Sequence, residues 1–242
     1  MMLPEKTLLF TSISVNQLRS KPIRHKVNPM KPKVVDFRQS QEALRSSLRE
    51  GMLDAASHLL QTEGAAALTV RKVAEAVNCS TTLLYSIFGG KDGLSNALYL
   101  EGFERFKSEF LSYEATLADE QKARGIQRLW LYANNYHAFA RRYPSYYMVM
   151  FGDAIAGFVP PPESRQAAWE SFTPLIAEFE HCMQTGSLPA SSPSAAARLL
   201  WAAMHGVISL ELKGFYLKQE HADELFQSAV RAVLISLQHP PG

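Results

Sequence analysis

Apolar side chains recur at steps of three and four residues along most of this chain, which is the period of an amphipathic α-helix. The first such run begins at about Gln41 and stops near Gly64. We expect Thr69 to be the N-cap of a second helix, because its side-chain oxygen can accept a hydrogen bond from a free backbone N–H. Asn78 tolerates the left-handed conformation that ends a helix, so the second helix is expected to stop there.

A third helix is expected to be unusually short. Ser80 is its N-cap and Gly89-Gly90 ends it, which leaves Thr81–Phe88. Leu84 and Phe88 lie four residues apart and can face inward. Hydroxyl-bearing side chains are left on or near the opposite face: Thr81, Thr82, Tyr85 and Ser86. A short helix that is held by its inner face and presents such groups can enter a DNA major groove, where hydroxyls contact phosphates and base edges.

Helical periodicity continues along the chain and predicts an all-α fold. Further helices are expected over Leu94–Phe110, from Asp119 to Arg142, over Glu163–Met183, from Ser192-Pro193 to about Lys218, and over Ala222–Leu237. The Ser-Pro pair is typical of an N-cap and the first helical position. We expect an N-terminal three-helix helix-turn-helix domain over residues 41–94, followed by a larger helical domain for ligand binding and dimerisation over residues 95–242.

Charge is distributed unevenly along the chain. Residues 1–40 carry eight Lys and Arg against two Asp and Glu, a formal charge of +6, so the remainder carries −4 of the total of +2. Four prolines and the lack of any period predict that this arm is disordered in isolation. Its composition fits a solvated tail and a segment that contacts nucleic acid equally well. Met30 is an alternative start, because regular structure is expected only well after it.

Composition narrows the class of protein. Hydrophobic residues make up 47% of 242 positions, enough for a substantial core. Cys79 and Cys182 share no short metal or redox spacing with histidines, so we expect neither a disulfide framework nor a metal or other cofactor. No apolar run approaches the roughly 20 residues that span a bilayer, and the opening lacks the features of a secretory signal. We therefore expect a soluble, cytoplasmic protein with no membrane partner.

Several motifs follow one another in a particular order. A helix ends in Glu63-Gly64, a Thr-Val-Arg-x-Val-Ala helix start begins at Thr69, and Ser-x-x-x-Leu-Tyr-x-x-Phe-x-x-Lys-Asp-x-Leu runs from Ser80 to Leu94. In this combination, residues 48–94 resemble the DNA-binding domain of TetR-family transcriptional regulators. The resemblance implies roles in phosphate contact for Thr69, Ser80 and Tyr85, in reading or approaching bases for Arg71, Thr81, Thr82 and Ser86, and in holding a phosphate at the positive end of the fourth helix for Lys91.

The sequence departs from the family pattern at four positions. Asn78 stands where Gly is usual and Cys79 where Val is frequent, and both are compatible with the turn and its small core position. Thr82 replaces a common Gly, and Ile87 replaces a frequent His, Tyr or Arg. These two change the DNA-facing surface, so the operator preference of relatives does not carry over. The ordinary interpretation of Thr69 and Ser80 is that they only cap helices, and that of Tyr85 is a half-buried core aromatic.

The segment WAAMHGVISLEL, Trp201–Leu212, resembles the Trp-His-Gly class of C-terminal domains of TetR-family proteins, through Trp201, His205 and Gly206. This resemblance implies release from DNA by a small molecule and homodimerisation through the last two helices. A four-helix bundle about a two-fold axis would bury the apolar positions of these helices. They are Leu199, Leu200, Ala203, Val207 and Leu210, then Leu225, Ala229, Val233 and Leu237.

Aromatic and Met side chains can wall an apolar pocket, and a His or Asn can anchor a polar group there. The candidate effector-binding residues are Trp130, Asn134, Tyr136, His137, Tyr147, Phe151, Trp169, Phe172, Met204 and His205. Any one of the apolar members can equally be ordinary core, and His205 can instead satisfy a backbone carbonyl.

The resulting hypothesis is a homodimeric repressor that binds a palindromic double-stranded DNA operator and is released by a small lipophilic or aromatic effector. One alternative is a DNA-binding regulator without an effector. Another is an α-helical enzyme with His137 or His205 as general base, although the sequence offers no nucleophile, metal cluster or paired carboxylates to assist. A third is a membrane-surface protein held by the basic arm.

Overall fold

The computed structural model describes residues 36–116, 124–152, 154–216 and 218–239. The chain divides into two compact units, residues 1–40 and 41–242. Residues 1–35 of the predicted basic arm, Met30 among them, lie outside the described residues. Every regular element in the described part of the chain is a helix, so the predicted all-α fold is confirmed.

The helix-turn-helix comprises α1 (Phe37–Glu63), α2 (Val70–Ala76) and α3 (Thr81–Phe88), with a short 3-10 turn at Ala65–Ala67. Thr69 accepts a hydrogen bond from the N–H of Lys72 and so caps α2, as predicted. Asn78 takes the left-handed conformation, with φ of 53°, where the chain turns toward α3. Leu84 and Phe88 are buried, so α3 is held by the predicted inner face.

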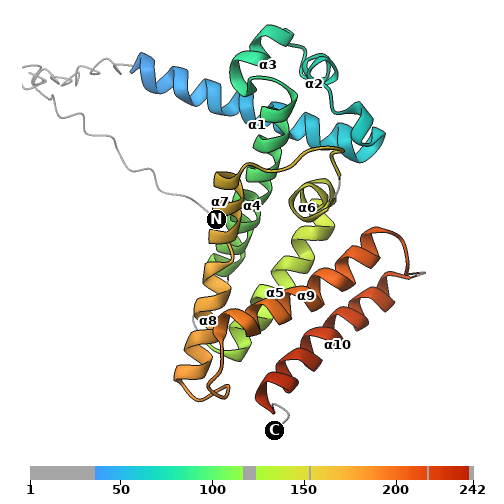
Figure 1. Ribbon diagram of the computed structural model, residues 1–242. Helices are drawn as coiled ribbons and strands as arrows, with labels where there is room; N and C mark the ends of the chain where they lie inside the picture. Colours follow the sequence, from blue (N-terminus) through green and yellow to red (C-terminus); the bar gives the residue numbers. More distant parts are fainter. Residues whose placement is uncertain (1–35, 117–123, 153, 217, 240–242) are drawn as a thin grey trace, which may run out of the picture. The chain divides into compact units, whose positions relative to one another are not determined.

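The rest of the unit consists of seven helices in the described residues: α4 (Lys91–Thr116), α5 (Ile126–Arg142), α6 (Pro144–Phe151), α7 (Pro162–Glu170), α8 (Thr173–Gln184), α9 (Pro193–Leu212) and α10 (Gln219–Gln238). Figure 1 shows α4 running from the helix-turn-helix to the remaining helices, and both views place α9 beside α10. Buried apolar residues from α1 to α10 form one cluster, so α1 to α3 share a core with the rest of the unit.

Some predicted helix limits are wrong. The helix expected over Glu163–Met183 is two helices that separate at Ser171-Phe172, since Pro174 opens a new first turn. The helix expected to reach Lys218 ends at Leu212. The first helix begins at Phe37, before the predicted Gln41, and the predicted start at Asp119 lies outside the described residues.

Buried charges are paired across helices. Glu178 on α8 is almost fully buried and pairs with Arg124 and Arg128 at 3.2 and 3.5 Å. Glu211 on α9 pairs with His137 at 2.8 Å and with Arg141 at 2.5 Å. Such pairs are costly to break because a lone buried charge would remain, so they fix α5 against α8 and α9.

Candidate DNA-binding surface and ligand cavity

All eight candidate DNA-binding side chains are exposed: Thr69, Arg71, Ser80, Thr81, Thr82, Tyr85, Ser86 and Lys91. Two of them are also helix caps. The hydroxyl oxygen of Thr69 accepts from Lys72 N–H, and that of Ser80 accepts from Leu83 N–H, each at 3.2 Å. Because a capping hydroxyl uses its oxygen as acceptor, its hydrogen stays available to a phosphate oxygen. Capping and phosphate contact are therefore compatible at both positions.

The other exposed groups differ in what they can offer DNA. The Ser86 hydroxyl donates to the carbonyl of Leu83 at 2.7 Å, so it can only accept, for example from a base amino group. The Arg71 guanidinium is paired with Glu75 at 2.8 Å on the same helix face. This pair is exposed and therefore weak, so Arg71 can exchange Glu75 for DNA at little cost.

Lys91 is the first residue of α4 and forms no ion pair with another described residue. Its charge and the positive end of the helix dipole therefore act together on an anion. Arg45 of α1, which the sequence reasoning missed, reaches across to donate to the carbonyl of Ser86 at 3.3 Å. It places a second cation beside the end of α3, at a sequence separation that no local motif reveals.

Two glycines fix the junction between α3 and α4. Gly89 ends α3 with φ of 74°, a conformation that side chains other than glycine rarely adopt. A Cβ atom at Gly93 would lie 1.7 Å from the carbonyl oxygen of Phe88. Only glycine therefore allows α4 to start so close to the end of α3, which brings Lys91 next to the candidate recognition helix.

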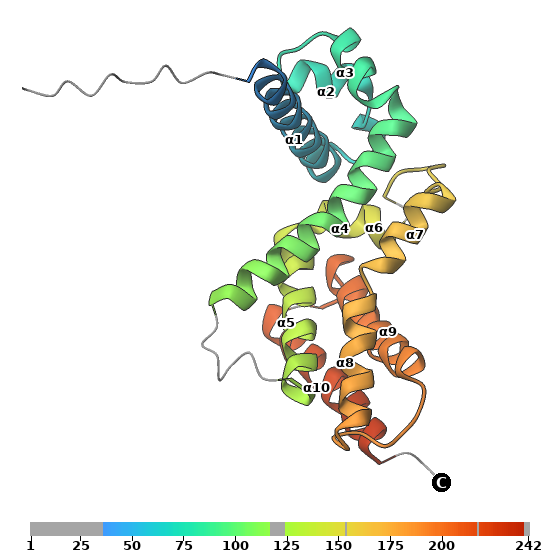
Figure 2. The same cartoon turned by 90° about the vertical axis from the view of Figure 1, so that its left-hand side faces the viewer.

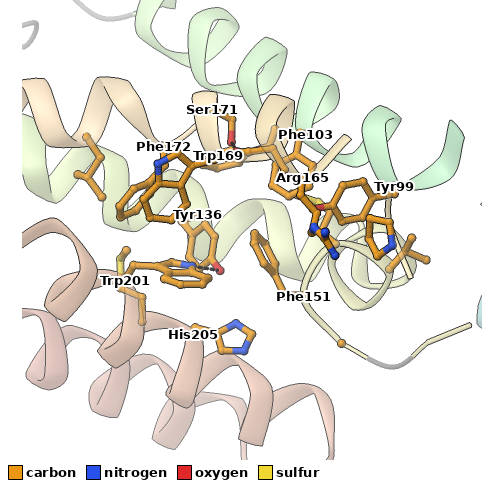
Figure 3. A pocket seen from close by; sticks show the side chains of 18 of the residues that line it. Tyr99, Phe103, Tyr136, Phe151, Arg165, Trp169, Ser171, Phe172, Trp201 and His205 are labelled. Atoms are coloured by element: carbon orange, nitrogen blue, oxygen red, sulfur yellow. Dashed lines mark hydrogen bonds between the residues drawn. The ribbon is translucent and has the colours of Figure 1, made fainter. Parts of the chain in front are cut away.

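A cavity of about 540 Å³ opens between helices α4 to α9. This lies within the range of about 300–1,000 Å³ typical of small-molecule sites. Aromatic rings dominate its wall, and Figure 3 shows them arranged around the space. The labelled lining residues are Tyr99, Phe103, Tyr136, Phe151, Arg165, Trp169, Ser171, Phe172, Trp201 and His205.

A chain of hydrogen bonds runs along one wall. Trp201 Nε1 donates to the Tyr136 hydroxyl at 3.0 Å, which is 3.0 Å from the Tyr147 hydroxyl. Tyr147 lies 2.7 Å from His205 Nδ1, and His205 Nε2 lies 3.2 Å from Ser209 Oγ. Since an indole can only donate, the arrangement that uses every hydrogen runs from Trp201 through Tyr136 and Tyr147 to a neutral His205 protonated at Nε2.

The pKa shifts of the side chains in this hydrogen-bonded series favour their neutral forms. Burial strongly raises the pKa of Tyr136, and it also raises that of Tyr147 far above its ordinary range. Burial, with a smaller effect of the Lys213 charge, lowers the pKa of His205. At neutral pH these hydrogen-bonded side chains therefore carry no charge, and they form a fixed polar strip in an apolar wall.

Six of the ten candidate effector-binding residues line the cavity: Tyr136, Phe151, Trp169, Phe172, Met204 and His205. Tyr147 is behind the wall, where it joins Tyr136 to His205. The other three are placed elsewhere. His137 pairs with Glu211 and stacks on Phe226. Asn134 is exposed and accepts a hydrogen bond from Gln227. Trp130 is half-buried and packs against the core.

Several lining residues escaped the sequence reasoning. Tyr99, Phe103 and Phe106 come from α4, and Arg165 comes from α7 after a run of prolines. Trp201 belongs to a sequence motif but not to the predicted effector-binding residues. Its spacing of four residues from His205 predicts that both side chains lie on one face of a helix. No comparable local signal marks Arg165.

The described residues contain no group of three or more His, Cys, Asp or Glu placed to hold a metal ion. Both cysteines are free thiols. None of the helices in the described part of the chain combines the length and the apolar character needed to cross a membrane.

Comparison with known families decides between the remaining classes. Residues 52–98 match the family "Bacterial regulatory proteins, tetR family", and residues 130–233 match "Tetracyclin repressor-like, C-terminal domain". The chain belongs to the TetR family. TetR-family proteins are DNA-binding transcriptional regulators without enzymatic activity, which removes the enzyme alternative. The Trp-His-Gly subclass predicted for the C-terminal domain is not confirmed by this match.

Individual relatives of this TetR-family chain are distant. The nucleoid occlusion factor SlmA of Vibrio vulnificus is 31% identical over 112 residues, which cover 46% of this chain and 55% of that relative. The chain thus spans about half the length of the curated relatives it matches.

Solved structures show the same fold at low identity. A protein of unknown function from Rhodococcus sp. RHA1 aligns with a TM-score of 0.67 at 21% identity, over 79% of this chain and 96% of its own. The fatty acid degradation regulator FadR from Bacillus halodurans aligns with a TM-score of 0.60 at 15% identity, over 79% and 96%. The TetR-family regulator PfmR from Thermus thermophilus aligns with a TM-score of 0.53 at 16% identity, over 79% and 99%.

Proposed function

We propose that the protein is a homodimeric repressor that binds a palindromic DNA operator and is released when a lipophilic small molecule enters the cavity between α4 and α9. One observation carries this proposal. Helix α4 begins with Lys91 beside the candidate recognition helix and contributes Tyr99, Phe103 and Phe106 to the cavity wall. At a rise of about 1.5 Å per residue, Lys91 and Tyr99 are only about 12 Å apart along one rigid helix.

This arrangement supports coupling between ligand and DNA. A ligand that displaces α4 at the cavity also moves Lys91. It moves the end of α3 as well, because Phe88 of α3 contacts α4 at Gly93. For release, the ligand must bind the DNA-incompetent arrangement more tightly, and only that difference weakens DNA binding. A tenfold change in operator affinity requires about 1.4 kcal/mol, which burial of part of one aromatic ligand can supply.

Helices α9 and α10 support the dimer. They pack on each other and leave large apolar side chains exposed: Leu199, Leu210, Leu225 and Ile235. Gly206 is exposed and has open space around it, so another helix can approach closely there. Two copies joined through this face would form a four-helix bundle and present two α3 helices to one DNA duplex, which favours a palindromic operator.

The proposed residue roles follow the geometry of the surface. Thr69, Ser80 and Lys91 contact phosphates and set the position of the protein on DNA. Thr81, Thr82 and Ser86 face base edges, and Arg71 reaches a base after leaving Glu75. Tyr85 contacts a phosphate through its exposed hydroxyl. The domain limits 41–94 and 95–242 are part of the same proposal.

The decisive experiment is fluorescence anisotropy of the purified protein on the DNA immediately upstream of its own gene, at several salt concentrations and with excess random competitor. Competitor-resistant binding is expected, and a saturating ratio of two protomers per site supports the dimer. Binding that vanishes with competitor would contradict an operator in that DNA. Footprinting then tests the palindrome, and a Leu210→Arg variant, which is expected to be monomeric by sedimentation, tests the α9–α10 interface.

A further inference from the structure

We infer that the ligand of the cavity is a lipophilic acid, with its anionic head group held by Arg165 at the α7 side of the cavity and its apolar body between the aromatic rings. This inference rests on the proposed function of the cavity as an effector site and adds the chemical class of the effector.

Arg165 is the one full charge among the described residues that line the cavity. The remaining lining groups are apolar, hydroxylic or aromatic, apart from the imidazole of His205. Burial lowers the pKa of His205 and so favours its neutral form. Arg165 forms no ion pair or hydrogen bond with another described residue. A guanidinium presents five donors in a planar fork that fits a carboxylate or another oxyanion. One that has no partner among the described residues and lies in a cavity wall can therefore bind an anion.

Tyr99 supplies a second donor at the same place. Its ring is buried, whereas its hydroxyl forms no hydrogen bond with another described residue. Tyr99 and Arg165 both line the cavity. Burial raises the pKa of Tyr99, and the positive charge of Arg165 opposes that rise. Figure 3 shows them side by side in the cavity. Two donors that have no partner among the described residues therefore lie in one region of the wall.

The polar groups of the hydrogen-bonded series from Trp201 to His205 are already satisfied. Trp201, Tyr136, Tyr147 and His205 use their hydrogens within one chain that ends at Ser209. A ligand carbonyl could take a hydrogen from this chain only by breaking one of its bonds. Ser171 likewise donates to the carbonyl of Ala168 at 2.6 Å. Donors that a ligand can use without such a loss are therefore found at Arg165 and Tyr99.

Exposure also favours an amphipathic acid over a neutral ligand or a compact anion. Arg165 is exposed, while Tyr136 and Met204, which also line the cavity, are buried. A head group at Arg165 stays near water and loses little hydration, whereas an apolar body between Phe151, Phe172 and Trp201 leaves water completely. A small anion such as phosphate would leave the aromatic space unused.

The test measures binding directly, in the absence of DNA. Isothermal titration calorimetry of the full chain compares decanoate, decyl sulfate, decan-1-ol and inorganic phosphate, with quenching of tryptophan fluorescence as a second readout because Trp169 and Trp201 line the cavity. We expect decanoate to bind at least about tenfold more tightly than decan-1-ol, since a hydrogen bond to a charged group is worth that much or more. Decyl sulfate binding as tightly as decanoate would indicate any oxyanion head group, and decanoate binding more tightly would indicate a carboxylate.

Variants locate the head group. Arg165→Gln is expected to abolish the preference for decanoate while leaving decan-1-ol binding unchanged, and Arg165→Lys to retain part of it because the charge remains. Arg142→Gln removes an exposed arginine outside the cavity and should keep the full preference. Equal affinity of the wild type for acid and alcohol, an unchanged preference in Arg165→Gln, or no binding of octanoate, decanoate, dodecanoate or palmitate would each overturn the inference.

The outcome separates this inference from the proposed function. If decanoate binds through Arg165 and the affinity for operator DNA stays the same, the acid site stands and the release mechanism fails. If DNA is released only by neutral molecules that bind Arg165→Gln and the wild type equally, the release mechanism stands and the acid site fails.

Discussion

The candidate DNA-binding surface takes its residues from one continuous stretch, Thr69–Lys91, whereas the cavity wall takes its residues from helices α4 to α9. The first surface depends on short-range features, namely two caps, a left-handed Asn78 and two glycines at a helix junction. The second depends on how separate helices pack. The two regions therefore respond to different substitutions. A change in local backbone conformation disrupts the candidate DNA-binding surface, whereas the loss of a contact between distant helices disrupts the cavity wall.

Helix α4 belongs to both regions, which makes its first turn the most sensitive point. Gly93→Ala would place a Cβ atom 1.7 Å from the carbonyl oxygen of Phe88. We expect a loss of about 2–3 kcal/mol in the free energy of unfolding, together with loss of specific DNA binding, because α3 and α4 must separate. Urea denaturation and DNA anisotropy measure the two effects.

Gly51→Ala is the matched control for this change. Gly51 is an exposed helical residue of α1, and a Cβ atom added there would meet no other atom within 4 Å. Alanine at this position should stabilise the protein by about 0.5–1 kcal/mol. Similar effects of the two substitutions would contradict the proposed role of the α3–α4 junction.

The cavity wall is tested by Tyr136→Phe. The substitution removes the acceptor of Trp201 Nε1 and the donor to Tyr147, so the half-buried indole N–H loses its partner and Tyr147 keeps only its bond to His205. We expect a loss of about 1–3 kcal/mol in stability. In Tyr99→Phe the lost hydroxyl has no partner among the described residues, so the change should stay within about 0.5 kcal/mol. Calorimetric melting of both variants decides, and equal melting temperatures would exclude a stabilising hydrogen-bond chain.

The sequence predicted the helix-turn-helix more fully than the cavity, for a physical reason. Capping, turn conformation and the inward spacing of Leu84 and Phe88 act over a few residues and are visible in the sequence. The position of Arg45 beside the end of α3 was not predicted, since its contact with Ser86 joins distant parts of the chain.

The cavity could be predicted only in part, because its residue types are also those of an ordinary core. Tyr136 and His137 are neighbours on α5, yet the first lines the cavity and the second pairs with Glu211 on another side of the helix. Periodicity shows that both are on a helix and does not show which neighbour each will meet. Arg165 was missed because its helix was predicted as part of one longer helix over Glu163–Met183, and the break at Ser171 sets its direction.

Substitutions on the DNA side should separate positioning from sequence reading. Lys91→Ala is expected to weaken binding to operator and random DNA alike, by about 1 kcal/mol, and to lower the salt slope by about one unit because one phosphate contact is lost. Thr81→Ala should cost a similar amount on the operator only. Anisotropy titrations over a range of salt concentrations measure both, and equal losses on both kinds of DNA for both variants would contradict the assignment.

The smallest expected effect is a pH dependence that belongs to the cavity and not to the DNA surface. Burial lowers the pKa of His205 below 6.5 in the folded protein, so the folded state favours the neutral ring. The stability that this contributes is complete above pH 6.5 and is lost as the pH falls through the folded-state pKa. Protonation puts a hydrogen on Nδ1, where the ring must accept from Tyr147, so acid also breaks the hydrogen-bond chain at its centre.

The melting temperature of the wild type should therefore fall more between neutral pH and about pH 5 than that of His205→Gln, which cannot titrate. Because the two proteins differ only at residue 205, the difference between their two curves reports on His205, and parallel curves would show that His205 does not couple the cavity wall to pH.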